Sequence, residues 1–283
     1  MIKRIALLAV VAMPAFAGSE TPKIWKNEFS IGGEVQHYHY KEPDIYQDFE
    51  RMRFTGWMDL KGILFGINGS YRLTYKDLLF VQPEGRVLIG REAYRYGESN
   101  VGVVIKTHRD IPDLIVEPRL LAGGNIPISE SLKVSPYTGI GYRLKIDDME
   151  QAIGSSQDHV FNGRVIGFYR KSNYVYIPLG VEVRYQVSDT WSVSTRGEYD
   201  YFIKGWQYTR SEKKVIPHPT VTNKQKGTHG LKGEITVGYQ LEKIKLSLTP
   251  YCYYWHIGNS PWKNGREPYN RTIETGLRFG VSF

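Results

Sequence analysis

Two long segments of this chain alternate between two kinds of side chain, and this pattern constrains the fold more than any other feature. In residues 174–187 and again in residues 191–204, the odd-numbered side chains are mostly apolar or aromatic and the even-numbered ones are more polar. Successive side chains of a β-strand point to opposite faces, so each segment is predicted to be a strand with one apolar face. Only Ser188-Asp189-Thr190 separates them, and so short a link predicts an antiparallel hairpin.

The same alternation, less regular in the first half, predicts ten strands. They cover residues 28–40, 52–75, 79–91, 113–125, 134–146, 174–187, 191–204, 231–240, 244–257 and 272–283. The links are alternately short and long, and the long ones fall near residues 41–51, 92–112, 147–173, 205–227 and 258–270. Short turns at one end and long loops at the other are typical of outer-membrane barrels. We predict an all-β fold, an antiparallel transmembrane up-and-down β-barrel of ten strands, and about eight to twelve fit the pattern. A parity change near Gly62 predicts a β-bulge.

The N-terminus predicts export. A basic start precedes an apolar run over residues 5–13, and Ala15 and Ala17 supply the small residues that a signal peptidase prefers. The run is about nine residues long, whereas a membrane-spanning helix needs about 20. We predict a signal peptide over residues 1–17 and one barrel domain over residues 18–283, which reaches the outer membrane of a Gram-negative bacterium by Sec-type export.

Composition narrows the partners and the chemistry. The net charge is +8, but no basic-aromatic cluster of a nucleic-acid module is present, so we expect no nucleic acid. Exposed Lys and Arg point instead to anionic lipopolysaccharide. Cys252 is the only cysteine, so no intramolecular disulfide can form, and we interpret it as a passive, buried or lipid-facing thiol. Because there is no phosphate loop, nucleophile elbow or Cys/His array, we expect no cofactor.

The last strand distinguishes a membrane barrel from a soluble one, which would alternate in the same way. Leu277, Phe279, Val281 and Phe283 form an apolar face that ends on an aromatic residue. Such a strand can pair with the outer-membrane assembly machinery and then close against the first strand, so we expect this machinery and outer-membrane lipid as partners. Aromatic residues near strand ends predict interfacial girdles. They are Tyr38, Tyr40, Tyr174, Tyr176, Trp191, Trp206, Tyr254 and Trp255.

Five segments also carry a likeness to known proteins. They are Tyr38-His39-Tyr40-Lys41-Glu42-Pro43, Gly66-Ile67-Asn68-Gly69-Ser70-Tyr71, Gly139-Ile140-Gly141-Tyr142-Arg143, Gly197-Glu198-Tyr199-Asp200-Tyr201-Phe202 and Gly276-Leu277-Arg278-Phe279-Gly280. On these segments the chain resembles a family of poorly characterised proteobacterial outer-membrane β-barrel proteins that are described loosely as porin-like. The resemblance extends over nearly all of the mature chain. It implies fold and location but no activity, so no catalytic residue is carried over.

Three histidines invite a reading as site residues. His37 and His39 share one strand face and could offer two metal nitrogens, but no third ligand is identifiable, so we interpret them as part of an interfacial His/Tyr belt. His256 near a strand end is the one candidate for a lipid A-modifying enzyme, and nothing fixes a partner for it.

One acidic pair and one Asp/His pair invite comparison with the omptin proteases, which are also ten-stranded barrels and carry such pairs at the outer rim. Asp147 and Asp148 lie in or beside the third long loop, as do Asp158 and His159. The Asp-x-His arrangement expected on one strand face does not occur here. Because an activated water needs converging groups, we interpret these residues as solvated loop residues.

The polar face of the strands predicts a charge network inside the barrel. Its members are Glu34, Arg72, Glu84, Arg86, Glu117, Arg119, Arg143, Glu182, Arg184, Arg196, Glu198, Asp200, Lys232, Glu234, Glu274 and Arg278, and Lys204 is placed with them. Their charges nearly cancel, and side chains of this size fill most of a lumen only slightly wider than that of eight strands. We predict a structural or surface-interaction barrel with extracellular loops and no enzymatic activity. The alternatives are a small or gated porin-like channel and, less expected, an omptin-like or lipid A-modifying rim enzyme.

Overall fold

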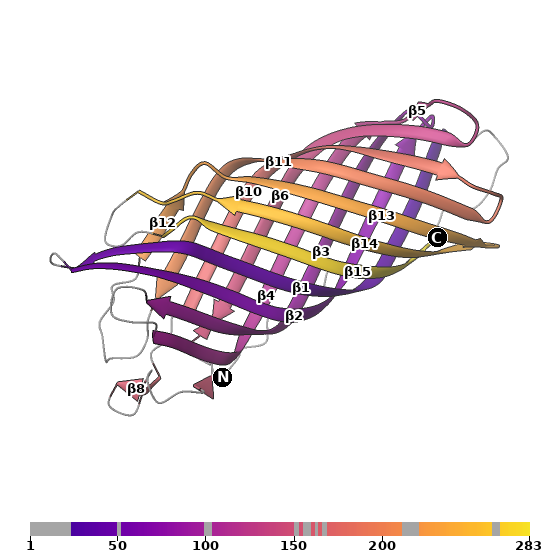
Figure 1. Cartoon of the computed structure of the whole chain (residues 1–283). Coiled ribbons are helices and arrows are strands. Elements are labelled where there is room, and N and C mark those ends of the chain that lie inside the picture. The colour runs from indigo at the N-terminus through magenta and orange to yellow at the C-terminus, as the bar shows by residue number, and fades with distance from the viewer. Residues whose placement is uncertain are drawn as a thin grey trace.

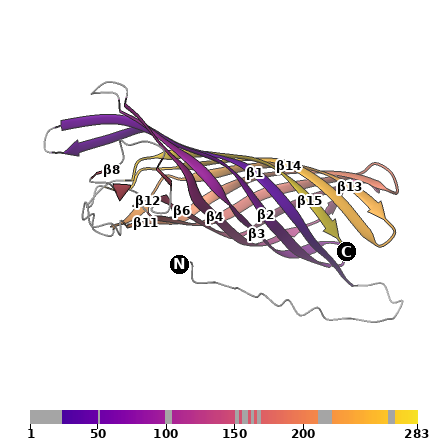
Figure 2. The same cartoon turned by 90° about the horizontal axis from the view of Figure 1, so that it is seen from below.

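In the computed structural model of this chain, ten long strands form one closed antiparallel sheet (Figures 1 and 2). The described residues are 24–49, 52–98, 104–149, 153–154, 160–161, 164–165, 169–210, 221–261 and 267–283. The long strands are β1 (Trp25–Phe49), β2 (Met52–Tyr75), β3 (Leu79–Glu98), β4 (Val104–Gly124), β6 (Leu132–Asp148), β10 (Tyr169–Gln186), β11 (Trp191–Arg210), β13 (His229–Leu241), β14 (Ile244–Ile257) and β15 (Asn270–Ser282). The short strands are β5 (Ile126–Pro127), β7 (Ile153–Gly154), β8 (Val160–Phe161), β9 (Arg164–Val165) and β12 (Val221–Gln225).

Closure of the sheet follows from one pairing. The first and last strands, β1 and β15, pair from Ser30 opposite Ser282 to Lys41 opposite Arg271. Each other long strand pairs with the long strands before and after it in sequence, which is the up-and-down order. The predicted fold class and the ten strands are therefore confirmed. Within the described part of the chain, no helix is long and apolar enough to cross a membrane.

The two ends of the barrel differ. Tight turns join β2 to β3, β10 to β11 and β13 to β14 at one end, which we call the turn end. The C-terminal residue Phe283 lies at this end, where its backbone pairs with Phe29. Strands β8 and β12 lie at the opposite end, which we call the loop end (Figure 2).

The strands reach further toward the loop end than the alternation predicted. β1 continues to Phe49, β3 to Glu98 and β4 begins at Val104, although residues 41–51 and 92–112 were expected to be loops. The hairpin of β1 and β2 therefore projects beyond its neighbours (Figure 1). The expected loop boundaries are wrong here because the alternation becomes irregular where strands leave the regular wall.

Outward-facing apolar side chains form a belt around the barrel. The belt includes Ile31, Ile63, Phe65, Ile67, Val87, Ile89, Leu120, Ile140, Leu179, Val181, Ile235, Leu248 and Phe279. Phe65 is 61% exposed and Ile89 is 62% exposed, whereas Arg72 and Arg86, on the other face of the same two strands, are buried inside. A soluble barrel buries its apolar face in the interior, so this orientation is the reverse of a soluble one.

The bulge predicted near Gly62 is wrong. Both the β1–β2 and the β2–β3 registers run through Gly62 without a shift. The alternation changes parity in the sequence only because Met58, Leu60 and Leu64 are apolar residues on the inward face. Apolar residues thus join the inward face of β2 toward the loop end while its backbone continues unchanged.

Buried clusters of apolar and aromatic side chains lie in the loop-end half of the interior. One buried cluster contains Tyr38, Tyr40, Met58, Leu60, Leu64, Leu88, Ile111, Ile115 and Met149, and a second contains Tyr174, Tyr176, Trp255 and Ile257. Five residues predicted for the interfacial girdles, Tyr38, Tyr40, Tyr174, Tyr176 and Trp255, are therefore wrongly placed, since they share the parity of the charged inward positions. Trp191, Trp206 and Tyr254 do face outward.

Candidate functional site

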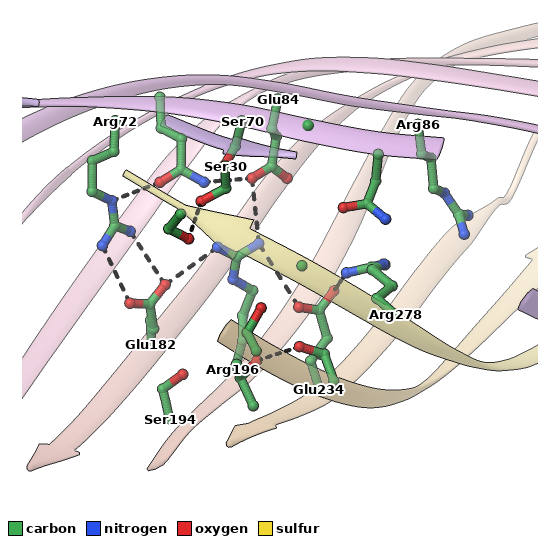
Figure 3. A pocket seen from close by; sticks show the side chains of 18 of the residues that line it. Ser30, Ser70, Arg72, Glu84, Arg86, Glu182, Ser194, Arg196, Glu234 and Arg278 are labelled. Carbon is green, nitrogen blue, oxygen red and sulfur yellow. Dashed lines mark hydrogen bonds and ion pairs between the residues drawn. The ribbon is translucent and has the colours of Figure 1, made fainter. Parts of the chain in front are cut away.

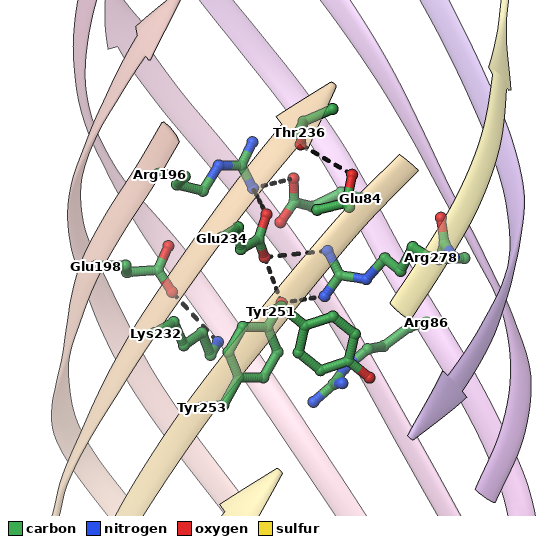
Figure 4. A network of polar contacts seen from close by, with 12 residues as sticks. Glu84, Arg86, Arg196, Glu198, Lys232, Glu234, Thr236, Tyr251, Tyr253 and Arg278 are labelled. Atoms are coloured by element: carbon green, nitrogen blue, oxygen red, sulfur yellow. Dashed lines mark hydrogen bonds and ion pairs between the residues drawn. The ribbon is translucent and has the colours of Figure 1, made fainter. Parts of the chain in front are cut away.

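The lumen is the candidate site, because the charged side chains converge there. Each of the sixteen residues in the predicted network lies on the inward face and contacts an opposite charge. The alternating backbone of the strands places them there, since inward residues recur at every second position. Figures 3 and 4 show part of this network, in which Arg196, Glu234 and Arg278 meet inside the barrel.

Glu117 on β4 is the centre of the network. Its carboxylate lies 2.7 Å from Nη2 of Arg86, 3.0 Å from Nη1 of Arg143 and 3.0 Å from Nζ of Lys232. The hydroxyl of Tyr176 donates a further hydrogen bond to it at 2.5 Å. Four donors therefore surround one carboxylate that is 1% exposed, so the charge is both buried and fully compensated.

Several contacts cross the whole lumen. Arg143 on β6 contacts Glu274 on β15, and these two strands are separated by four others in either direction around the sheet. Arg86 on β3 also reaches Glu274, at 2.7 Å. Side chains from opposite walls of the barrel therefore touch at this level of the lumen.

A second layer lies toward the turn end. Arg196 lies 3.2 Å from Glu182 and 3.4 Å from Glu84, while Arg278 lies 3.0 Å from Glu234 (Figures 3 and 4). Arg72 on β2 bridges the lumen to Glu182 on β10 at 3.2 Å. Between these side chains is a cavity of about 200 Å³.

Aromatic rings pack against the cations of the network. The Lys232 ammonium lies 4.8 Å from the ring centre of Tyr176 and 5.3 Å from that of Trp255, and Arg86 lies 4.9 Å from that of Tyr253. Cations attract the faces of such rings, most strongly where water is excluded. The aromatic residues thus hold the charged groups in place as well as filling space.

A third group of charges, which sequence reasoning missed, lies at the loop end. Lys145 lies 2.6 Å from Asp113 and 3.3 Å from Glu92, and Arg170 lies 2.7 Å from Asp147. The interpretation of Asp147 as a solvated loop residue is wrong, because it is 3% exposed inside β6. The sequence does carry a signal for this group. Inward residues of this strand have odd numbers, as Arg143 does, and Lys145 and Asp147 continue the series to the expected end of the strand at residue 146 and beyond it.

Glu42 belongs to this loop-end group and lies past the apolar belt. It accepts a hydrogen bond of 2.5 Å from Tyr40 and lies 3.6 Å from Arg170. Burial, together with the nearby carboxylate of Glu267, raises the pKa of Glu42 to about 8, although Arg170 opposes this shift. Beside the same group, a cavity of only about 20 Å³ remains, lined by Tyr38 and Trp255 among others.

Lys204 is the one inward assignment that is wrong. Val175 pairs with Lys204 but Tyr176 pairs with Phe202, so β11 contains one extra residue, Ile203. Such a bulge turns all later side chains to the opposite face. Lys204 is therefore exposed on the outside.

The residues considered for metal or enzymatic roles do not converge. His37 and His39 face outward, as does His256, whose ring centre lies 5.2 Å from that of His229. Within the described residues, no group of three or more His, Cys, Asp or Glu side chains could hold a metal ion. Cys252 is exposed on the outward face.

The remaining predicted residues lie in the last strand, at the end of β6, or in segments that the structure does not describe. Leu277, Phe279 and Val281 lie on the outward face of β15, and Phe283 follows them with 62% of its surface exposed. Asp148 lies at the end of β6. Four positions, Ala15, Ala17, Asp158 and His159, lie outside the described residues.

Comparison with known proteins shows the fold. No protein-family model and no curated protein matches this chain. Among solved structures, the chain is similar to the outer membrane protease OmpT from Escherichia coli, with a TM-score of 0.63 and 12% identity over 91% of this chain and 96% of that one. It also matches OprG from Pseudomonas aeruginosa, with a TM-score of 0.33 and 10% identity over 90% of this chain and 95% of that one. At 12% identity, the likeness to OmpT shows a common barrel architecture.

Proposed function

We propose that this chain is an integral outer-membrane β-barrel with a closed lumen and a structural or surface-interaction role. The contact between Arg143 and Glu274 carries the proposal, because it joins opposite walls of the barrel. A solute would have to separate this pair and the contacts of Glu117 beside it. Breaking a buried ion pair costs about 3 to 5 kcal/mol, so a network of them closes the lumen to general diffusion.

The apolar belt supports insertion in a bilayer. On β14, the outward side chains from Leu246 to Tyr254 form one uninterrupted row without charge. A tilted transmembrane strand needs about 9 to 11 residues, and this row meets that length. The apolar last strand, from Leu277 to Phe283, is the segment that we propose the assembly machinery recognises.

Charges beyond the belt support an orientation. Outward-facing cations gather on the loop-end side of it, and we call them the basic collar: Lys41, Lys61, Arg91, Arg95, Lys171, Lys204 and Arg271. Anionic lipopolysaccharide would be attracted to such a collar. We therefore propose that the loop end faces outside and that the turn end faces the periplasm.

A rim enzyme ranks lower. OmpT is a protease, and a similar activity here would need a base and a water-activating group inside the loop end. Carboxylates such as Glu92, Asp113 and Asp147 do gather there, but Lys145 and Arg170 bind them. Where histidine side chains are described, at positions 37, 39, 229 and 256, they lie on the outer face.

Single-channel recording in planar bilayers tests the proposal. The wild-type chain should give no sustained conductance, and Lys171→Gln, a change on the outer wall, should behave in the same way. Steady, salt-dependent openings of the wild-type chain would contradict a closed lumen and favour the small or gated channel. Cleavage of a peptide library or of lipid A by the purified barrel would favour the rim enzyme.

A further inference from the structure

The lumen widens below the second layer of ion pairs into a vestibule at the turn end. This vestibule has a volume of about 370 Å³. The charged side chains that line it are Lys26, Arg72, Lys133, Arg184, Lys243 and Lys245, against the acidic Glu28 and Asp77. Positive charge is thus in excess here, in contrast to the near-neutral network above.

Part of this charge is already neutralised. Lys26 pairs with Asp77 at 2.6 Å, and Arg72 pairs with Glu182 at 3.2 Å. Lys133 and Lys245, in contrast, have no ion-pair partner among the described residues. Both lie at inward positions of their strands, β6 and β14.

Lys133 and Arg184 also oppose one another. They are direct cross-strand partners on β6 and β10, and both point into the vestibule. Like charges placed directly opposite destabilise a sheet. Arg184 also pairs with Glu182, and a bound anion would relieve the repulsion that remains between Arg184 and Lys133.

Arg184 is held in a fixed orientation. Its Nε donates to Glu182, and its Nη1 lies 3.7 Å from the carboxylate of Glu28, which is an ion-pair distance without a hydrogen bond. Its side chain is 38% exposed, so the guanidinium keeps N–H groups free toward the vestibule. A guanidinium offers a planar fork that matches two oxygens of a phosphate, while lysines act as point charges beside it.

We propose that the vestibule binds a small multivalent oxyanion of the phosphate type through Lys133, Arg184 and Lys245. The volume fits a free phosphate or pyrophosphate, or the phosphate of one lipid headgroup. The site itself follows from the geometry of the turn end. Only the source of the ligand, the periplasmic side, rests on the proposed function.

Titration calorimetry with inorganic pyrophosphate tests this site in the full-length barrel in a neutral detergent. The wild-type chain should bind one equivalent, and binding should weaken as salt rises. Lys133→Gln and Lys245→Gln should each weaken binding about tenfold or more, whereas Lys133→Arg should keep most of it. Lys224→Gln changes an exposed cation on β12, at the loop end, and should leave binding unchanged.

Absence of saturable pyrophosphate binding by folded wild-type barrel would overturn the proposal, as would an equal loss in Lys224→Gln. Heat-modifiable migration of each variant shows that the barrel is intact. A short-chain phosphatidic acid separates the two sources: displacement of bound pyrophosphate at stoichiometric amounts assigns the site to a lipid headgroup, and lack of displacement assigns it to a soluble phosphate. Conductance tests the closed lumen separately, so the two proposals can fail independently.

Discussion

At the scale of single residues, the charges of the lumen depend on one another. Arg196 contacts Glu182 at 3.2 Å and Glu84 at 3.4 Å, and its side chain is 16% exposed. Removing the cation leaves both carboxylates buried without this partner, which costs about 3 to 5 kcal/mol for a well-buried pair. We expect Arg196→Ala to lower the free energy of unfolding by that order. Urea titration of the folded barrel in detergent measures it.

Lys204→Ala provides the matched control for this change. Lys204 lies on the same strand but faces outward because of the bulge at Ile203. An exposed substitution away from special features changes stability by about 0.5 kcal/mol at most. Equal losses for Arg196→Ala and Lys204→Ala would contradict the inward placement of Arg196.

The carboxyl of Glu42 gives the loop end a dependence on pH. Its pKa is about 8 in the folded barrel because of burial, against an ordinary value of 4.5. A carboxyl whose pKa is higher in the folded than in the unfolded chain contributes to stability. This contribution is complete at pH values below the ordinary pKa of 4.5 and is lost as the pH rises through about 8. Stability should therefore fall between about pH 5 and pH 8, by up to about 1.4 kcal/mol per pH unit.

Glu42→Gln removes the titrating group and keeps an acceptor for the hydroxyl of Tyr40. Unfolding midpoints measured at pH 5, 7 and 9 should decline more steeply for the wild-type chain than for this variant. Parallel declines would show that Glu42 titrates normally in the fold.

At the scale of the strand, each face has one environment. Val181 is 41% exposed on the outward face of β10, and its neighbour Glu182 is buried in the lumen. A charge on the lipid face near the bilayer midplane costs about 2 to 4 kcal/mol. Val181→Arg should show this loss in folding titrations with lipid vesicles, whereas Ser188→Arg in the adjacent turn should show little. A loss that persists in plain buffer would favour a soluble barrel.

The terminal strand tests assembly. Phe279 and Phe283 are both more than half exposed on the outward side, and β15 must pair with β1 to close the barrel. Backbone groups left unpaired in lipid are costly, so a last strand that cannot seat prevents closure. Deletion of Phe283 should reduce the heat-modifiable barrel in outer-membrane fractions without changing synthesis. Normal barrel levels in that strain would count against the assembly signal.

Strand parity explains which features could be predicted. The ten strands and the inward positions of residues such as Glu117 and Arg143 follow from period-two alternation, which every regular strand must show. The alternation does not show where apolar or aromatic residues replace charged ones on the inward face, so the positions of Leu60 and Tyr176 inside the barrel could not be predicted. A bulge adds one residue without changing composition, and for this reason the reversal at Lys204 left no sign in the sequence.

At the scale of the whole molecule, the network couples walls that share no backbone hydrogen bonds. Arg143 and Glu274 join opposite strands, and each also has a second partner, Glu117 for the arginine and Arg86 for the glutamate. Removing both members of the pair leaves Arg86 and Glu117 in contact with each other at 2.7 Å, so no isolated charge remains. The lumen becomes wider, but its net charge does not change.

A double-mutant cycle on Arg143 and Glu274 measures how strongly the two residues depend on each other. It tests whether they join opposite walls or act as independent, weakly coupled charges. Arg143→Ala and Glu274→Ala should each cost up to about 3 to 5 kcal/mol, because each deprives its buried partner of one of its two opposite charges. The double variant should cost less than their sum by about 0.5 to 3 kcal/mol. Under the proposed closure of the lumen by this pair, the double variant should pass small ions in planar bilayers while each single variant passes fewer. Additive losses of stability, together with a double variant that shows no conductance, would mean that this pair does not join the opposite walls. Closure of the lumen would then have to come from other residues.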